Sequence, residues 1–354
     1  MYVCIVGGIY GADALLRNTM LRTPEILLER ALRMRGYKVT ALDLYTRDLP
    51  PADIVHVHHL AMGTVRIAAM RRRPPLVYTS HDSEALCDVQ DGMKRLVARQ
   101  FVFSRAQAVV ALSDTEYEFQ ETKYRIRGAA HRVIPNGIEE TLFPFRPRTR
   151  HEDLGRPWRL LFIGQLNSLK GVDILLRAMA RSTHPLELQL IYQNSQLETY
   201  LKDLAADLGV ARNVHFCGPV PYDRLSEYHR SADLLMVPST AESLPSVVSE
   251  ALFSGLPVVA TTVGGIPWQL RGDGVLCPPG DADALWKAID TAICNYPLLS
   301  ERAEEVSKRA RKRFSVDGMV DAHIALYEAA LQSRRPQTSS WVDGLRALTA
   351  QLRD

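Results

Sequence analysis

One stretch, residues 238–262 (PSTAESLPSVVSEALFSGLPVVATT), constrains the fold more than any other part of the sequence. An apolar strand over residues 234–237 precedes it, and a second apolar strand follows at residues 258–260. A short loop between them leads into a helix, and Pro245 favours a helix start near this point because the missing proline N–H needs no partner in a first turn. Strand, loop, helix and strand form a βαβ unit, so we predict a parallel sheet with this loop at the carboxyl end of a strand.

Two carboxylates make this loop and helix a candidate binding site. Glu242 lies in the loop, and Glu250 lies eight residues later, within the helix. Ligands of open α/β sheets bind at this edge, and the free N–H groups of a first helical turn attract anions. Two acceptors beside an anion site suit a nucleotide sugar. The alternative is an ordinary amphipathic core helix whose Glu250 points to solvent.

The composition is that of a globular protein large enough for two domains. The chain has 354 residues, and its 43 basic residues are nearly balanced by 40 acidic ones, so charge gives no indication of a nucleic-acid partner. The 5 cysteines are far apart and form no CxxC pair, which favours a reducing compartment and argues against a zinc site of that type. There is no signal-peptide pattern and no long apolar run, so we expect a cytoplasmic protein.

The first half of the chain alternates strands and helices. A strand at residues 3–6 runs into Gly7 and Gly8, and a helix at residues 24–35 follows a long segment, residues 9–23. A later strand ends at His81 and Asp82, on its carboxyl edge. His56 and His58 share one face of another strand, which leaves open a metal pair or a structural role.

The second half repeats the pattern after a Pro- and Arg-rich linker. A strand begins at Trp158 and ends at Gly164, and Lys170 stands at the start of the next helix, where a cation hints at an anionic partner. We predict a first domain over residues 1–145, a linker over 146–157, a second domain over 158–313, a helix over 314–332 that crosses back to the first domain, and a tail over 333–354. The tail's apolar face suits packing on the protein, a partner or a membrane surface.

The segment E-S-L-P-S-V-V-S-E-A-L-F-S-G-L-P-V-V-A-T resembles the glutamate–seven–glutamate signature of retaining glycosyltransferases of family 4, which have the two-domain GT-B architecture. The turn at residues 135–138 (PNGI) resembles the corresponding turn of that family. The resemblance implies an α/β fold of two Rossmann-like, doubly wound domains that face a cleft. It also implies that Glu242 holds hydroxyls of the donor sugar, that the following backbone receives the diphosphate, and that Glu250 binds the ribose.

The resemblance extends to further residues. It implies catalytic roles for His81, Glu242 and Lys170, and places Tyr10, Asp82 and Asn136 on the acceptor side. The residues it implies for donor binding are Gly7, Gly8, Gly164, Gln165, Lys170, Glu242, Ser243, Leu244, Pro245, Ser246, Val247 and Glu250. The chain departs from the family pattern at Gln165, where an arginine is usual, and at Trp268, where a glutamate is usual.

The expected function is metal-independent, retaining transfer of a sugar from a nucleotide-diphosphate sugar to a hydroxyl acceptor, with UDP- and GDP-sugars as the expected donors. No cofactor is expected. The acceptor is a small molecule, lipid or saccharide, and a peripheral membrane contact remains open. Two alternatives keep the same fold: a non-catalytic subunit, which Gln165 and Trp268 favour, and a nucleotide-sugar epimerase, which the glutamate spacing disfavours.

Overall fold

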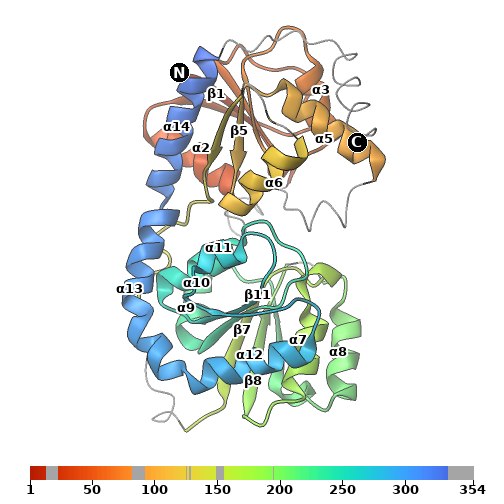
Figure 1. The fold of residues 1–354 in the computed structure, drawn as a ribbon, viewed down its shortest axis with the longest axis vertical. Helices are drawn as coiled ribbons and strands as arrows, with labels where there is room; N and C mark the ends of the chain where they lie inside the picture. Colours follow the sequence, from red (N-terminus) through yellow and green to blue (C-terminus); the bar gives the residue numbers. More distant parts are fainter. Residues whose placement is uncertain are drawn as a thin grey trace. The chain divides into compact units, whose positions relative to one another are not determined.

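In the computed structural model the chain folds into two compact units (Figure 1). The first comprises Met1–Gly137 together with the residues from Val316 onward, and the second comprises Ile138–Ser315. The structure describes residues 1–12, 23–81, 92–124, 126, 129–148, 155–193 and 195–333. Each unit contains one six-stranded sheet in which all the strand pairs are parallel.

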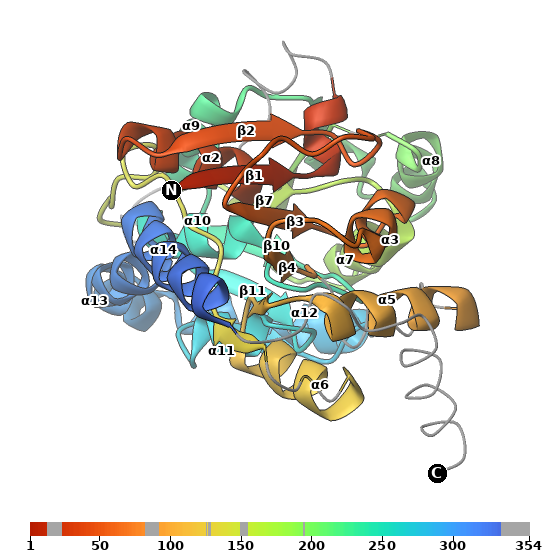
Figure 2. The same cartoon turned by 90° about the horizontal axis from the view of Figure 1, so that it is seen from above.

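The first sheet has the strand order β2-β1-β3-β4-β5-β6, part of which can be followed in Figure 2. Its strands are β1 (Tyr2–Val6), β2 (Lys38–Leu42), β3 (Ile54–His58), β4 (Leu76–Thr79), β5 (Ala108–Ala111) and β6 (Ala130–Val133). The helices of this unit are α2 (Pro24–Met34), α3 (Met62–Ala69), α5 (Met93–Arg105), α6 (Asp114–Tyr124) and α14 (Val316–Gln332). Every residue of β3, β4 and β5 is buried, as expected for parallel strands covered on both faces.

The second sheet has the order β12-β11-β10-β7-β8-β9. Its strands are β7 (Trp158–Ile163), β8 (Leu186–Ile191), β9 (Val214–Gly218), β10 (Leu234–Val237), β11 (Val258–Thr261) and β12 (Val275–Cys277). The helices are α7 (Val172–Met179), α8 (Glu198–Asp207), α9 (Leu225–Ser231), α10 (Ser246–Ser254), α11 (Ile266–Leu270), α12 (Ala282–Cys294) and α13 (Tyr296–Phe314). Leu160 and Leu161 lie in two different core clusters, one on each face of this sheet.

The predicted fold class, α/β with two Rossmann-like domains, is confirmed. In each sheet the direction of strand progression reverses once, between β1 and β3 in the first and between β7 and β10 in the second. Ligands of doubly wound sheets bind beside the carboxyl ends of the strands at such a reversal. The reversals therefore indicate where in each unit to look for a site.

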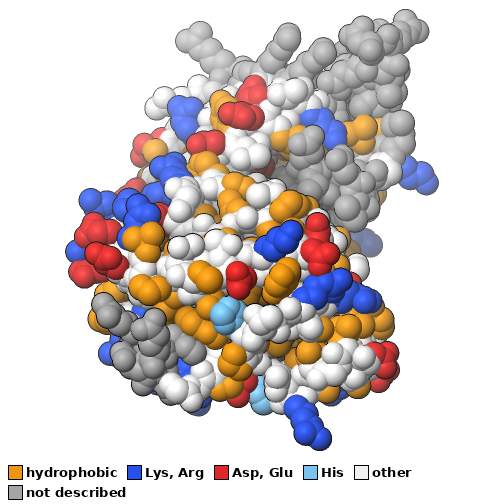
Figure 3. All heavy atoms as spheres, turned by 60° about the horizontal axis from the view of Figure 1, so that its bottom comes forward, with side chains coloured by type: hydrophobic (Ala, Val, Ile, Leu, Met, Phe, Trp, Pro, Cys, Tyr) orange, Lys and Arg blue, Asp and Glu red, His pale blue; other side chains and the backbone are white. Residues whose placement is uncertain are grey.

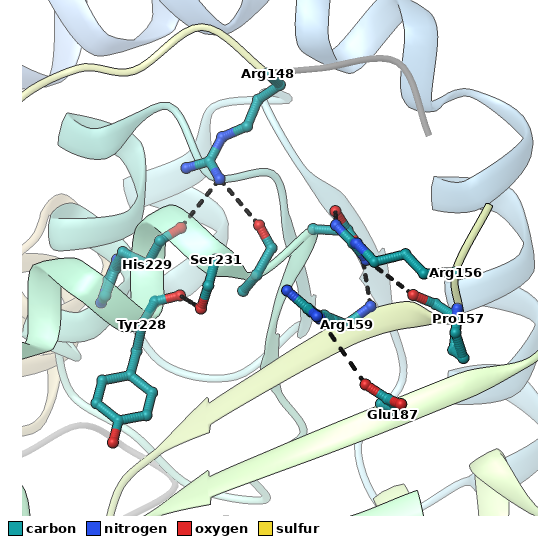
Figure 4. A network of polar contacts seen from close by, with 10 residues as sticks. Arg148, Arg156, Pro157, Arg159, Glu187, Tyr228, His229 and Ser231 are labelled. Atoms are coloured by element: carbon teal, nitrogen blue, oxygen red, sulfur yellow. Dashed lines mark hydrogen bonds and ion pairs between the residues drawn. The ribbon is translucent and has the colours of Figure 1, made fainter. Parts of the chain in front are cut away.

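Arginines from the Pro- and Arg-rich segment anchor it to the second unit. The Arg148 guanidinium donates a hydrogen bond to the carbonyl oxygen of His229 (3.0 Å), as Figure 4 shows. It also donates to the carbonyl oxygens of Ala232 (2.9 Å), Ser254 (3.2 Å) and Gly255 (2.9 Å). These carbonyls end helices α9 and α10, whose C-termini carry partial negative charge. Burial lowers the pKa of Arg148. Carbonyl dipoles from two helix ends therefore solvate this partly buried cation.

A second arginine of the same segment pairs with a carboxylate. Arg156 donates to both oxygens of Asp233, at 2.7 and 2.9 Å, and the backbone N–H of Arg159 donates to Asp233 at 2.8 Å. The predicted linker therefore has fixed contacts on both sides of residues 149–154, which lie outside the described part of the chain.

A cavity of about 840 Å³ lies beside the amino ends of β7 and β8, lined by residues that include Trp158, His184 and Tyr296. It is therefore at the edge of the second sheet opposite to the carboxyl ends of the strands. On the face drawn in Figure 3, hydrophobic side chains gather in small groups between charged and polar ones. No helix in the described residues combines the length and the apolar character needed to cross a membrane.

Candidate functional site

In the second unit, Glu242 and Lys170 form an ion pair at the carboxyl ends of β10 and β7. Lys170 Nζ lies 2.6 Å from Glu242 Oε1, and Ser239 Oγ donates to the same oxygen at 2.8 Å. Glu242 is 8% exposed, so its carboxylate is largely removed from water and held by two donors. The structure thus brings together two of the residues that the sequence predicted to bind the donor.

The loops that carry these residues pack backbone against backbone. The N–H of Thr240 donates to the carbonyl oxygen of Leu169 at 2.8 Å. Gly171 has φ +62°, and a Cβ placed there would lie 2.1 Å from the carbonyl oxygen of Pro238. Only glycine permits both this backbone angle and this approach, so Lys170 is fixed next to the Glu242 loop.

Helix α10 begins at Ser246 with no side-chain cap, and Pro245 is its N-cap residue. Within the described residues, the backbone N–H groups of Ser246 and Val247 have no hydrogen-bond partner. A first turn with open N–H groups and the positive end of the helix dipole favours an anion. The helix start predicted from Pro245 is thus consistent with a diphosphate position.

Glu250 is buried inside α10, at 3% exposure, and accepts a hydrogen bond from Tyr222 OH at 2.8 Å. Burial raises its pKa to about 7, and the hydrogen bond from Tyr222 opposes this rise. The alternative in which Glu250 points to solvent is therefore wrong. Its carboxyl group therefore keeps its proton to a higher pH than an exposed glutamate does.

The remaining predicted donor residues of the second unit surround the same edge. Gly164 directly follows β7, and its N–H donates to the carbonyl oxygen of Ile191 at 3.0 Å. Gln165 is exposed and accepts a hydrogen bond from Asn167 Nδ2 at 3.2 Å. Ser243 and Leu244 lie in the loop between Glu242 and Pro245. Gln165 thus puts a neutral side chain where the family pattern has a cation.

In the first unit, Gly7, Tyr10 and His81 come together at the carboxyl ends of β1 and β4. Tyr10 OH donates to the carbonyl oxygen of Glu25 at 3.1 Å, and a Cβ placed at Gly7 would lie 3.5 Å from Glu25 Oε1. Gly8 is exposed and begins a short 3-10 segment, Gly8–Gly11. Asn136 lines the same small pocket as His81. Asp82 lies outside the described residues.

Of the groups around His81, the sequence singled out His58, in a possible pair with His56, but not Glu25 or His59. His58 Nδ1 lies 2.9 Å from His81 Nε2, the rings of His59 and His81 stack with centroids 4.3 Å apart, and His59 Nε2 lies 3.0 Å from Glu25 Oε1. Burial, with neighbouring histidines, holds the pKa of His81 well below its usual value. His56 has no part in this group, because Tyr327 OH and Thr79 Oγ1 occupy its two ring nitrogens at 2.8 Å each.

This fold and these motifs are those of GT-B glycosyltransferases. Residues 13–142 match the family model described as "Glycosyltransferase Family 4". Residues 148–313 match the family model described as "Glycosyl transferases group 1". A D-inositol 3-phosphate glycosyltransferase of Acidothermus cellulolyticus is 34% identical over 80% of this chain and 68% of its own length. One of Geodermatophilus obscurus is 31% identical over 85% of this chain and 74% of its own. The chain belongs to glycosyltransferase family 4 and is a glycosyltransferase.

Solved structures support the architecture. Sucrose-phosphate synthase of Thermosynechococcus elongatus superposes with a TM-score of 0.79 at 18% identity, covering 93% of this chain and 98% of that one. Anabaena HepE, in complex with UDP and glucose, superposes with a TM-score of 0.74 at 20% identity, covering 93% of this chain and 100% of that one. At these identities the likeness establishes the fold.

Proposed function

We propose that this chain is a retaining glycosyltransferase that moves a sugar from a nucleotide-diphosphate sugar to a hydroxyl acceptor without a metal ion. One observation carries the proposal: Lys170 and Glu242 are paired beside the open first turn of α10, with Glu250 buried within that helix. A cation and helix N–H groups suit a diphosphate, while two carboxylates suit sugar and ribose hydroxyls.

The mechanism follows from these roles. As the bond between the anomeric carbon and the diphosphate oxygen breaks, negative charge grows on the diphosphate, where the amides of Ser246 and Val247 and the Lys170 ammonium stabilise it. The acceptor hydroxyl attacks from the face that the leaving group vacates, and a phosphate oxygen of the donor takes its proton. Glu242 orients the sugar and is not the nucleophile. We assign to His81 a contact with the donor sugar, and to the first unit the binding of the acceptor.

The names of similar proteins suggest which substrates to test first. UDP-glucose is present in a structure of Anabaena HepE, and the relatives named above are D-inositol 3-phosphate glycosyltransferases. UDP-sugars and inositol phosphate are therefore the first donor and acceptor. We place the reaction in a reducing compartment such as the cytoplasm, since Cys4, Cys217, Cys277 and Cys294 are free thiols.

The donor site is tested by Lys170→Met. We expect the affinity for the best ligand in a panel of UDP-, GDP-, ADP- and TDP-sugars, measured calorimetrically in EDTA, to fall about 10- to 100-fold, because a charge-assisted bond contributes about 1.5–3 kcal/mol. Lys202→Met is the matched control, since Lys202 forms an exposed ion pair with Glu198 at the same 2.6 Å distance. Equal affinity in wild type and Lys170→Met would contradict the proposal.

The stereochemical outcome is a separate prediction. With an α-linked donor, we expect the product to be α-linked, because attack occurs on the face that the leaving group vacates. NMR coupling constants of the anomeric proton in the first-formed product measure this directly. Full activity in EDTA is expected in the same assay. A β-linked product would overturn the front-face mechanism, and loss of activity in EDTA would overturn metal independence.

A further inference from the structure

His81, to which we assign a contact with the donor sugar, is held at three points in the first unit. His58 Nδ1 lies 2.9 Å from His81 Nε2, and the ring of His59 stacks on that of His81 with the centroids 4.3 Å apart. Ser80, the residue before His81, donates from its Oγ to Glu116 Oε1 at 2.6 Å. Contacts from separate elements therefore set the direction of the His81 ring.

The backbone of His81 needs such contacts. Its φ is +54°, in the left-handed region that non-glycine residues rarely adopt. Residues in this conformation persist only where the surrounding structure determines it, and they gather at functional sites. His81 therefore depends on its neighbours to keep its conformation.

His58 and His81 are both neutral at pH 7. Burial lowers the pKa of His58 to about 3 and, with neighbouring histidines, holds that of His81 well below its usual value. A neutral imidazole has one N–H donor and one acceptor nitrogen, so the contact joins the donor of one ring to the acceptor of the other. The two possible arrangements differ in whether the buried His58 Nε2 carries a proton. They therefore differ in energy, and we expect one tautomer of His81 to prevail.

His58 is a costly residue for a purely structural role. It is 2% exposed, and its Nε2 has no hydrogen-bond partner within the described residues. An unsatisfied buried polar atom destabilises a fold, and an apolar side chain of similar size would avoid that cost. His56, two residues earlier on β3, has both ring nitrogens bonded at 2.8 Å. What His58 adds over an apolar residue is its contact with His81.

We propose that His58 is a positioning residue for donor binding, which holds His81 Nε2 and leaves Nδ1 directed to a hydroxyl group of the donor sugar. The inference rests on the proposed function, in which His81 contacts that sugar. Among the described residues, the structure gives His81 Nδ1 no hydrogen-bond partner, so this nitrogen is available to a ligand. A sugar hydroxyl can donate or accept, so it suits either tautomer. His58 itself touches no substrate and acts through His81.

Calorimetry on the full-length chain in EDTA, with the best nucleotide sugar of the panel and with its nucleoside diphosphate, tests this role. We expect His58→Leu to bind the nucleotide sugar about three- to tenfold more weakly than wild type, the effect of one hydrogen bond. It should bind the nucleoside diphosphate, which lacks the sugar, as wild type does. His58→Asn, whose amide can still donate or accept near the position of Nδ1, should recover most of the affinity.

A double-mutant cycle shows whether His58 acts through His81. In a His81→Gln background, we expect His58→Leu to have no further effect on the affinity for the nucleotide sugar, because the contact is already lost. Additive losses of affinity in the double variant would overturn the proposal, and so would a His58→Leu protein that binds the nucleotide sugar as tightly as wild type.

His323→Leu is the matched control. His323 is also buried and lines the same small pocket as His58, its Nδ1 lies 2.8 Å from the carbonyl oxygen of Met319, and its Nε2 has no partner in the described part of the chain. Its ring lies beside those of His56 and Tyr327. This variant should bind the nucleotide sugar as wild type does. Equal losses in His323→Leu and His58→Leu would overturn the proposal.

Nitrogen NMR of the histidine rings tests the contact in the free protein, with the His81 signals assigned from their absence in His81→Gln. We expect one tautomer of His81 in wild type and a mixture in His58→Leu. A mixture in wild type, or the same single tautomer in both proteins, would overturn the proposal. Failure of the proposed function has a different result: wild type binds no nucleotide, or Lys170→Met binds it as wild type does. The ring spectra then still decide whether His58 positions His81.

Discussion

Replacing Gly264 with alanine is expected to disrupt the loop that carries Glu242 and to abolish measurable donor binding or unfold the second unit. Gly264 has φ +52°, and a Cβ placed there would lie 1.9 Å from the carbonyl oxygen and 2.8 Å from the carbonyl carbon of Glu242. The contacted atoms are backbone, so no side chain can turn away. The N–H of Gly265 donates to the carbonyl oxygen of Ser243 at 2.7 Å, which holds the two loops together. We expect a loss of more than about 3 kcal/mol in the free energy of unfolding.

Gly272→Ala separates the effect of backbone angle from that of the collision. Gly272 has φ +85°, but a Cβ there would have no atom within 4 Å. Alanine at this position therefore carries only the left-handed penalty, about 1–2 kcal/mol. Urea unfolding of both variants, followed by tryptophan fluorescence, gives the comparison. Equal losses of stability in the two variants would show that the Glu242 loop tolerates displacement.

Replacing Glu250 with glutamine is expected to stabilise the free protein at pH 8 and to weaken donor binding. In the folded state the pKa of Glu250 is about 7, above the value of 4.5 for an exposed glutamate. Below pH 4.5 both states hold the proton, and as the pH rises to 7 the unfolded state loses it first, so stability falls. Above pH 7 the folded state contains a buried charge. The resulting loss in the free energy of unfolding is about 3 kcal/mol, at 1.36 kcal/mol for each unit by which the pKa is raised.

Glutamine cannot ionise and still offers an oxygen to Tyr222 OH, so the variant avoids this penalty. We expect Glu250→Gln to exceed wild type in unfolding free energy by about 2–3 kcal/mol at pH 8 and by little at pH 5. Glu301→Gln, which changes an exposed carboxylate on α13, should show no such dependence on pH. Donor affinity should fall at least tenfold in Glu250→Gln, since its carboxylate is proposed to hold the ribose. A Glu250→Gln protein with wild-type stability at pH 8 would contradict the assignment of a buried charge.

The sequence was sufficient for the fold because strands inside the two sheets, such as β4, β5, β10 and β11, are short apolar runs. The βαβ unit around Glu242 was predicted with its helix start, and α10 begins at Ser246. Glu250 was recognised by its spacing from Glu242, but periodicity alone left two orientations open. Its buried position depends on the contact with Tyr222, which lies 28 residues away.

Other features could not be predicted, because they depend on contacts between distant segments. Arg148 belongs to a stretch without periodicity, and its carbonyl partners come from the ends of two later helices. Glu25 is an ordinary first-turn carboxylate in the sequence, and His59 is one residue beyond a strand. Their meeting with His81 depends on the positive φ angles of both histidines, for which the sequence has no glycine or asparagine as a signal.

The placement of α14 has a consequence for the order in which the chain folds during its synthesis. This helix belongs to the first unit, where Tyr327 is buried and its OH lies 2.8 Å from His56 Nδ1 on β3. The ribosome must therefore make the whole second unit before the last core element of the first unit exists. Since domains generally fold as they emerge, we expect the second unit, which is continuous in sequence, to reach its native state earlier. The first unit is the first to begin synthesis and the last to be completed.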